Sequence, residues 1–357
     1  MSQPTINELV NRRVALEARL QHETGELAET AARAYDREYS GLQRELAVHF
    51  RAAADDQSRI TAMLEMIRIL ENRLVYLQNF TVDPTADNRM LAQLVTHFID
   101  DLARTRSAVL TNLEATYFRA VAALYAGDVP RASEGFRDAC ASEESDEAND
   151  IKYKSYVILG NLSHEERDYA KAKDLHDQSL RYSANNNVTA QALALKALNS
   201  YALDAHDEAL HLFQEALQLF DVNQPFFNSY FFRNALLFCG AILFDRKDYA
   251  HAAEFYQRVV DNVEQSSYDY FDALAHLGRI HYMKERYDDA VASLEQAIRS
   301  QKLSENEYII DTWFLIARAH LKRDDPASAR KYLEKIAATD VRYDKKPQAV
   351  ELLQRIA

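Results

Sequence analysis

The chain has 357 residues with only 7 Gly and 6 Pro, and helix-forming residues such as Ala, Leu, Glu and Arg dominate it. Apolar residues make up 48% of the chain, which excludes an intrinsically disordered protein. The net charge of −13 argues against nucleic acid as the main partner, because phosphate binding needs a basic surface. Met1–Arg13 lack the apolar core of a secretory signal, and charges interrupt every apolar run before about 18 residues. We therefore expect a cytoplasmic protein without membrane insertion.

The N-terminal part, residues 1–83, is predicted to be a helical arm. Residues 5–80 contain no proline, and from residue 60 the apolar side chains alternate in steps of three and four. This alternation is the spacing of a coiled-coil seam. The seam consists of Ile60, Met63, Ile67, Leu70, Leu74 and Leu77. Within the arm, Ala53–Asp56 followed by Ser58 indicate a bend or a fresh helix start.

Two arrangements of the arm remain open at this point. It either folds back and packs on the rest of the chain, or it pairs with a second copy as a homodimerising coiled coil. The segment Thr81–Asp87 contains Pro84 and is expected to end the arm helix. A new amphipathic helix from Asn88 is predicted to lead into the remainder of the chain.

A pattern of small residues recurs along the C-terminal two-thirds at intervals near 40 residues, and we call these residues the anchors. The anchors are Ala120, Gly160, Ala197, Gly240, Gly278 and Ala317. An alanine stands twelve residues after each anchor, and an apolar position follows four residues later. That position holds Phe136, Phe213, Tyr256, Leu294 and Leu333, with His176 as the exception. The spacing predicts pairs of antiparallel helices that cross closely where small residues meet.

The pattern resembles the tetratricopeptide repeat family, whose usual period is about 34 residues. The resemblance implies an all-α, right-handed superhelical solenoid over residues 88–357, built of about six helix-turn-helix repeats and preceded by the coiled-coil arm. The predicted repeats span residues 113–146, 153–186, 190–223, 233–266, 271–304 and 310–343. A capping helix over residues 347–357, which begins at Pro347, is expected to close the array.

No set of residues typical of a catalytic or metal site occurs in the sequence. It contains no glycine-rich nucleotide loop, no HExxH and no GxSxG. Cys140 and Cys239 stand far apart and are expected to be packed thiols. His276 and His281 are five residues apart, so they do not have the i, i+4 spacing of a helical metal pair. We therefore expect a non-catalytic protein without cofactors or metal ions.

In the tetratricopeptide repeat family, first-helix residues that point away from the second helix form a concave groove. The resemblance implies that Tyr117, Asn161, His164, Tyr201, Asn234, Phe244, Arg279, Tyr282, Phe314, Arg318 and Lys322 line a peptide-binding groove here. The C-terminal half combines arginines with aromatic rings, which suits an acidic or phosphorylated peptide because guanidinium groups pair bidentately with such anions. The other interpretation is that these arginines are ordinary surface residues paired with Asp272 or Asp311.

The expected function is therefore a scaffold or adaptor for protein–protein interaction, with a partner polypeptide in the groove and an arm that dimerises or docks. The alternative is a regulatory protein that changes conformation when it closes around a short signalling peptide. The aromatic run over residues 226–232 is expected to pack mostly between repeats, with one or two rings left for the groove or a partner surface.

Overall fold

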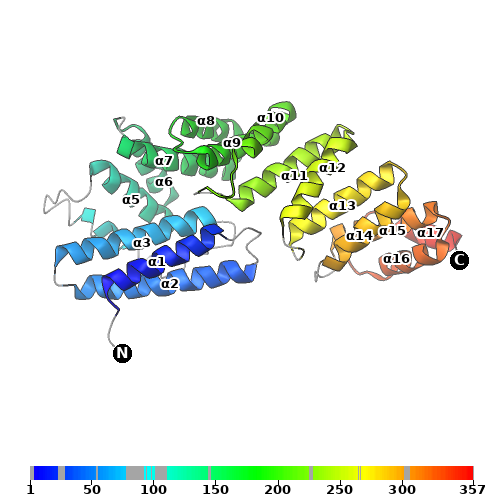
Figure 1. Cartoon of the computed structure of the whole chain (residues 1–357), viewed down its shortest axis with the longest axis horizontal. Coiled ribbons are helices and arrows are strands. Elements are labelled where there is room, and N and C mark those ends of the chain that lie inside the picture. Colours follow the sequence, from blue (N-terminus) through cyan, green and yellow to red (C-terminus); the bar gives the residue numbers. More distant parts are fainter. Residues whose placement is uncertain are drawn as a thin grey trace. The chain divides into compact units, whose positions relative to one another are not determined.

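The computed structural model shows a helical protein in two compact units (Figure 1). It describes residues 4–22, 29–53, 55–77, 92–93, 95–97, 99–100, 111–143, 146–224, 228–263, 265, 267–300 and 306–356. Within these ranges the only regular elements are helices, and no residue forms a strand. Of the described residues, those up to Asn228 belong to the first unit and those from Ser229 onward belong to the second. The all-α fold class predicted from the sequence is confirmed.

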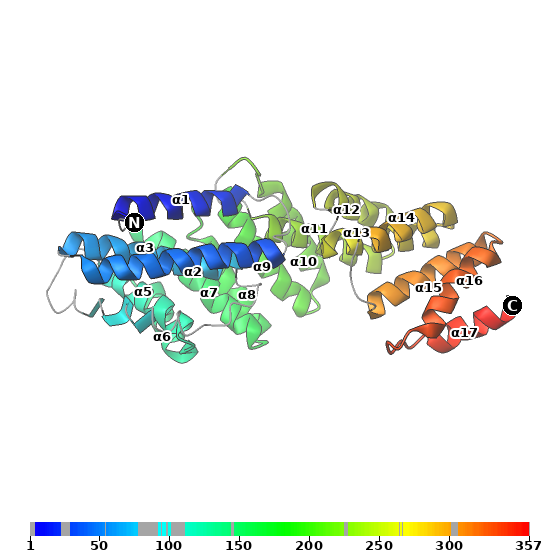
Figure 2. The ribbon, with the colours of Figure 1, turned by 90° about the horizontal axis from the view of Figure 1, so that it is seen from below.

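The arm consists of three helices rather than one. They are α1 (Ile6–His22), α2 (Glu29–Ala52) and α3 (Asp56–Leu77), and each packs against the other two (Figure 2). Ion pairs of 2.6 Å between Arg12 and Glu45 and 2.5 Å between Arg19 and Glu38 join α1 to α2. Because the residue numbers rise along α1 as they fall along α2, these two helices run antiparallel.

The helix start expected near Ala53–Asp56 is confirmed. The Ser58 amide donates a hydrogen bond of 2.8 Å to the Asp55 carboxylate, which caps the beginning of α3. The chain turns back between α2 and α3, so the structure has the second of the two expected alternatives, a fresh helix start.

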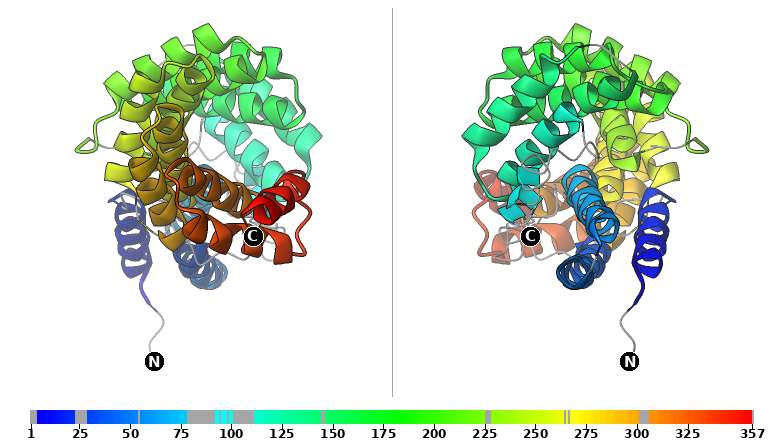
Figure 3. Two further views of the ribbon diagram at one scale, coloured as in Figure 1. Left: turned by 90° about the vertical axis from the view of Figure 1, so that its right-hand side faces the viewer. Right: turned by 90° about the vertical axis from the view of Figure 1, so that its left-hand side faces the viewer.

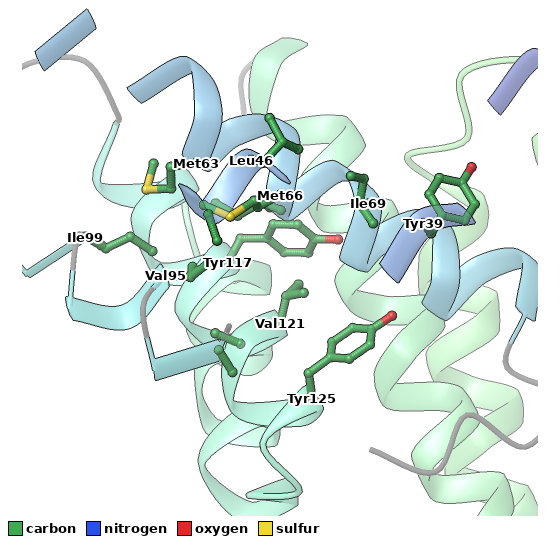
Figure 4. Close-up of a cluster of buried hydrophobic side chains, with 14 of the residues drawn as sticks. Tyr39, Leu46, Met63, Met66, Ile69, Val95, Ile99, Tyr117, Val121 and Tyr125 are labelled. Carbon is green, nitrogen blue, oxygen red and sulfur yellow. The ribbon is translucent and has the colours of Figure 1, made fainter. Parts of the chain in front are cut away.

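The seam residues of α3 lie in the interior of the first unit. Ile60, Met63 and Ile67 are at most 4% exposed, in a cluster that also contains Tyr117 and Val121 of the first repeat (Figure 4). The side chains of Leu70, Leu74 and Leu77 lie outside the described residues. Helix α3 also contacts α5 (Asn112–Tyr125) directly. The arm thus packs on its own chain here, and dimerisation through it stays a prediction.

Each repeat is a pair of helices, which we call the A helix and the B helix. The A helices are α5, α7 (Asp146–Glu165), α9 (Asn186–Ala202), α11 (Ser229–Asp245), α13 (Tyr268–Met283) and α15 (Glu307–Lys322). The B helices are α6 (Val129–Cys140), α8 (Tyr169–Leu180), α10 (His206–Leu219), α12 (Tyr249–Asn262), α14 (Tyr287–Ser300) and α16 (Pro326–Ala338). Every A helix packs against its own B helix. The last helix, α17 (Lys346–Arg355), lies beside α16 at the C-terminus (Figure 3).

The anchors have the role that the sequence predicts for them. All six anchors are buried, and a Cβ added to Gly160 or Gly278 would lie 2.4 Å from His176 or Leu294, far inside van der Waals contact. At Gly240 the corresponding distance to Tyr256 is 2.9 Å. A larger anchor would push the B helix away from the A helix, so the small residue determines how closely the two helices approach.

The turns between A and B helices repeat one backbone geometry. At each turn a single residue has a positive φ, which is unusual for any residue except glycine. These residues are Gly127, Arg167, Asp204, Lys247, Glu285 and Asp324. In four repeats the next residue is an aspartate that caps the B helix by accepting a hydrogen bond from a backbone amide: Asp128, Asp168, Asp248 and Asp325. These turns orient each B helix against its A helix.

Candidate functional site

The candidate site lies on the A helices, along the line where consecutive A helices meet. In the second unit, an ion pair of 2.7 Å joins Arg279 of α13 to Asp311 of α15, which are consecutive A helices. Arg279 stands one residue after its anchor, and Asp311 stands six residues before its own. We define the A-helix face of the second unit by these two positions in its three repeats: Asn234, Ala241, Asp272, Arg279, Asp311 and Arg318.

In the first unit, the predicted groove residue Tyr117 lies in the interior. It is 2% exposed, and its ring lies 5.8 Å from that of Phe136 and 5.6 Å from that of Phe118. Figure 4 shows it among side chains of the arm, including Met66. A partner has no access to this ring in the structure, because the arm packs over the first repeat.

Four further candidates lie at the end of their A helix and pack against the B helix that follows. His164, Tyr201, Phe244 and Tyr282 each pack against the first residue of the following B helix, with ring centroids 4.9–5.5 Å apart. Each of them is half-buried. These ring pairs close the turn between the two helices, so only part of each ring is available to a partner.

Polar contacts link the A helices of the second and third repeats. The Nδ1 atom of His164 lies 2.8 Å from the Oδ1 atom of Asn199, so the imidazole and the amide are within hydrogen-bond distance across α7 and α9. Asn161 is half-buried one turn before His164. In the second unit, Asn234 is also half-buried. These side chains offer hydrogen-bonding groups to a partner.

The negative charge of the Asp311 carboxylate is neutralised by groups of the same chain. Besides Arg279, it accepts a hydrogen bond of 2.9 Å from the hydroxyl of Tyr343 and one from the ammonium group of Lys345. Burial alone would raise the pKa of Asp311, but the bonds from Lys345 and Tyr343 and the charge of Arg279 outweigh it and lower that pKa. Arg279 therefore fits the interpretation of a surface arginine that is paired within the chain.

Arg318 differs from Arg279. Its guanidinium carbon lies 5.2 Å from the ring centroid of Tyr282 and 5.9 Å from that of Phe314, within cation–π range of both rings. Among the described residues, no carboxylate pairs with Arg318, which is exposed. Phe314 itself is only 5% exposed and packs edge-on against Tyr343. The exposed Lys322 lies one turn further along α15.

Asp272 holds the position of Asp311 one repeat earlier, yet its surroundings are different. Its side chain is 33% exposed, and the nearest basic group is Nε2 of His276 at 3.7 Å. Burial, together with the charge of Asp269, raises the pKa of Asp272 to about 6. Burial and the charge of Arg279 lower the pKa of His276 to about 4, so this imidazole is neutral at pH 7.

Sequence reasoning missed two exposed tyrosines of the second unit, Tyr268 and Tyr308, and named a third, Tyr230, only as part of the aromatic run. Tyr230, Tyr268 and Tyr308 stand at the beginning of α11, α13 and α15 and are 39%, 41% and 63% exposed. Their recurrence at one end of successive A helices was the available signal. In the aromatic run, Phe226 and Phe227 lie outside the described residues, whereas Phe231 is buried.

Among the described residues there is no metal-ligand cluster, no membrane-spanning helix and no disulfide. No three His, Cys, Asp or Glu side chains there gather as metal ligands, and no helix has the length and apolar character needed to cross a bilayer. Cys140 and Cys239 form no disulfide, and burial raises the pKa of both thiols to about 12. Both thiols are thus protonated at neutral pH and poorly nucleophilic.

The chain resembles known proteins in part of its sequence and in its helical fold. The family profile of the tetratricopeptide repeat matches residues 272–303, which cover most of α13 and all of α14. MamA from Desulfovibrio magneticus RS-1 is 18% identical with a TM-score of 0.43, over 57% of this chain and 96% of that protein. YrrB, a TPR protein with an unusual peptide-binding site, is 17% identical with a TM-score of 0.45, over 62% and 98%. PilF from Pseudomonas aeruginosa is 16% identical with a TM-score of 0.46, over 63% and 90%. No curated protein matches the chain at a significant level.

Proposed function

Because the chain is a tetratricopeptide-repeat protein, we propose that it is a non-catalytic scaffold that binds a partner polypeptide on the A-helix face of its second unit. The repeats create this face by bringing side chains from three A helices together. The first repeat is less suited to binding at Tyr117, because the arm covers this side chain.

The observation that carries this proposal is the state of Arg318. Two aromatic rings restrict its guanidinium, and no carboxylate of the described residues neutralises it. Holding an arginine in place before binding lowers the entropy that is lost when a ligand orders it. A guanidinium fork can then accept a carboxylate of the partner in a bidentate pair. We therefore propose that the partner segment is acidic where it meets Arg318, with Lys322 as a second cation.

The arm serves docking or dimerisation in this proposal. Its described seam residues are buried by helices of the same chain, so a second copy would contact other parts of the arm. Val14 on α1 and Val48 on α2 are 49% and 46% exposed and belong to such outer surfaces. Light scattering of the full chain distinguishes the two roles: a mass of two copies supports dimerisation, whereas a mass of one copy limits the arm to docking.

Selection of peptides from a random 12-residue display library on the full chain tests the proposed function. We expect the wild-type chain to enrich peptides rich in Asp and Glu, and Arg318→Gln to lose that enrichment. Arg299→Gln is the matched control, since Arg299 is an exposed arginine of the same unit on a B helix and pairs with Glu295. Equal enrichment by wild type and Arg318→Gln would refute a role for Arg318. Scattering with a selected peptide tests the peptide-sensor alternative, which requires a smaller radius on binding.

A further inference from the structure

Two aspartates occupy the same position in successive repeats but have different partners. Asp272 and Asp311 both stand six residues before an anchor on an A helix. Asp311 receives a guanidinium, an ammonium and a hydroxyl group. The guanidinium comes from Arg279, one residue after the anchor of the preceding repeat. For Asp272 the corresponding residue is Ala241, which has no charge to offer. The repeat pattern thus leaves Asp272 without the cation that its equivalent has.

The neighbours of Asp272 do not replace that cation. Nε2 of His276 is 3.7 Å away, but burial keeps this imidazole neutral. Arg233 is committed to Asp269, with Nε 2.9 Å from the carboxylate. No other described basic side chain pairs with Asp272. The charge of Arg279 acts on Asp272, but Arg279 pairs with Asp311 and does not offset burial and the charge of Asp269, so the pKa of Asp272 stays raised. A partly buried carboxylate in this state loses hydration without gaining an ion pair, and a cation from outside would supply one.

An exposed aromatic ring, that of Tyr268, lies near this carboxylate and packs against a second exposed ring, that of Tyr308. Tyr268 is one helical turn before Asp272 and therefore lies on the same side of α13. The rings of Tyr268 and Tyr308 meet edge to face, with centroids 6.4 Å apart and planes at 82°. They are 41% and 63% exposed. A lysine or arginine can pack its aliphatic stem on such rings and place its charge near the carboxylate.

We infer that Asp272, Tyr268 and Tyr308 form a binding site for a lysine or arginine side chain of the partner polypeptide. This inference rests on the proposed function and extends it, since the same segment would place a carboxylate on Arg318. The partner thus carries both signs of charge. The chain's net charge of −13 also attracts a basic segment over longer distances.

The fold also predicts the spacing of the two charges. Asp272 and Arg279 are seven residues apart on α13, a rise of about 10 Å, and Arg318 holds the position of Arg279 on the adjacent A helix, roughly 10 Å to the side. Asp272 and Arg318 are therefore separated by about 14 Å. An extended peptide covers this distance in about four residues. We expect a basic and an acidic residue to be separated by that interval in the peptides that bind.

The test is a cycle of binding measurements on the full chain, using one peptide selected by the wild-type protein from the display library. Its lysine or arginine is replaced by norleucine, and both peptides are titrated against wild type and Asp272→Asn by fluorescence anisotropy. We expect the replacement to weaken binding to wild type by about tenfold or more, as for a charge-assisted hydrogen bond, and to change binding to Asp272→Asn by less than about twofold. Asp288→Asn, which alters an exposed carboxylate on the B helix α14, is the control and should behave like wild type.

The outcomes separate the inference from the proposed function. If wild type selects peptides without a basic residue, or if both proteins lose the same affinity on the norleucine replacement, the inference is wrong while the proposed function stands. If wild type selects no peptides at all, both are wrong. Thermal unfolding of Asp272→Asn verifies that the variant is folded, and a peptide that still binds it through Arg318 gives the same assurance.

Discussion

His176 is expected to weaken the fold, and leucine in its place should stabilise it. The side chain is completely buried, and neither ring nitrogen has a hydrogen-bond partner among the described residues. The same position holds Leu294 in the fifth repeat, where Leu294 packs on the glycine anchor just as His176 packs on Gly160. His176→Leu therefore gives the second repeat the leucine-on-glycine packing that the fifth repeat already has.

The size of the stabilisation expected for His176→Leu follows from the burial of the histidine and from its protonation. Burial, with a smaller contribution from His164, lowers the pKa of His176 to about 3 in the folded state. The unfolded chain keeps a histidine pKa of about 6.5, so below that pH the unfolded state binds a proton that the folded state excludes. Stability then falls by about 1.4 kcal/mol per pH unit as the pH decreases from 6.5 toward 3. Removing two unsatisfied buried atoms adds about 1–3 kcal/mol that does not depend on pH.

Urea unfolding followed by circular dichroism at pH 7.5 and pH 5.0 measures both contributions. His176→Leu should be more stable by about 1–3 kcal/mol at pH 7.5, and its advantage should grow by about 2 kcal/mol at pH 5.0. His211→Leu, at a side chain that is 80% exposed, is the control and should show neither effect. An advantage of the same size at both pH values would refute the argument from protonation. No advantage at pH 7.5 would refute the argument from unsatisfied atoms.

Four further substitutions are expected to change the free energy of unfolding, measured by urea titration at pH 7.5. Ala205→Asp should stabilise by about 1 kcal/mol, because Ala205 begins a B helix without the side-chain cap that aspartate supplies in other repeats. Asp272→Asn should stabilise by about 1 kcal/mol after allowance for solvent screening, whereas Asp311→Asn should destabilise by about 1–2 kcal/mol, because only Asp311 has cationic partners. Glu65→Ala should destabilise by about 3–5 kcal/mol, because it removes a buried carboxylate that forms an ion pair with the buried Arg13.

Each of these expectations has an outcome that contradicts it. Equal effects of Asp272→Asn and Asp311→Asn would show that the difference in their surroundings has no energetic consequence. A neutral Glu65→Ala would mean that water or another group compensates the Arg13 guanidinium. A destabilising Ala205→Asp would mean that the turn after Asp204 cannot place a carboxylate at the amide of the B helix.

The sequence by itself determined the repeated part of this fold. The anchors and the alanines opposite them could be recognised because close helix crossing tolerates only small side chains, and this requirement recurs with each repeat. The position of His176 as an exception was also evident from the alignment of the repeats. The aspartate caps left a recurring signal too, which sequence reasoning did not use.

Only the tertiary structure decided what the A-helix face offers to a partner. Arg279 and Arg318 hold the same position in the repeat, yet one pairs with Asp311 and the other lies on two aromatic rings. Tyr117 fits the groove pattern but is covered by an arm that comes from a distant part of the sequence. A periodic pattern shows which residues share a face. Whether a charge on that face is already neutralised depends on contacts between repeats, and those contacts exist only once the helices have packed.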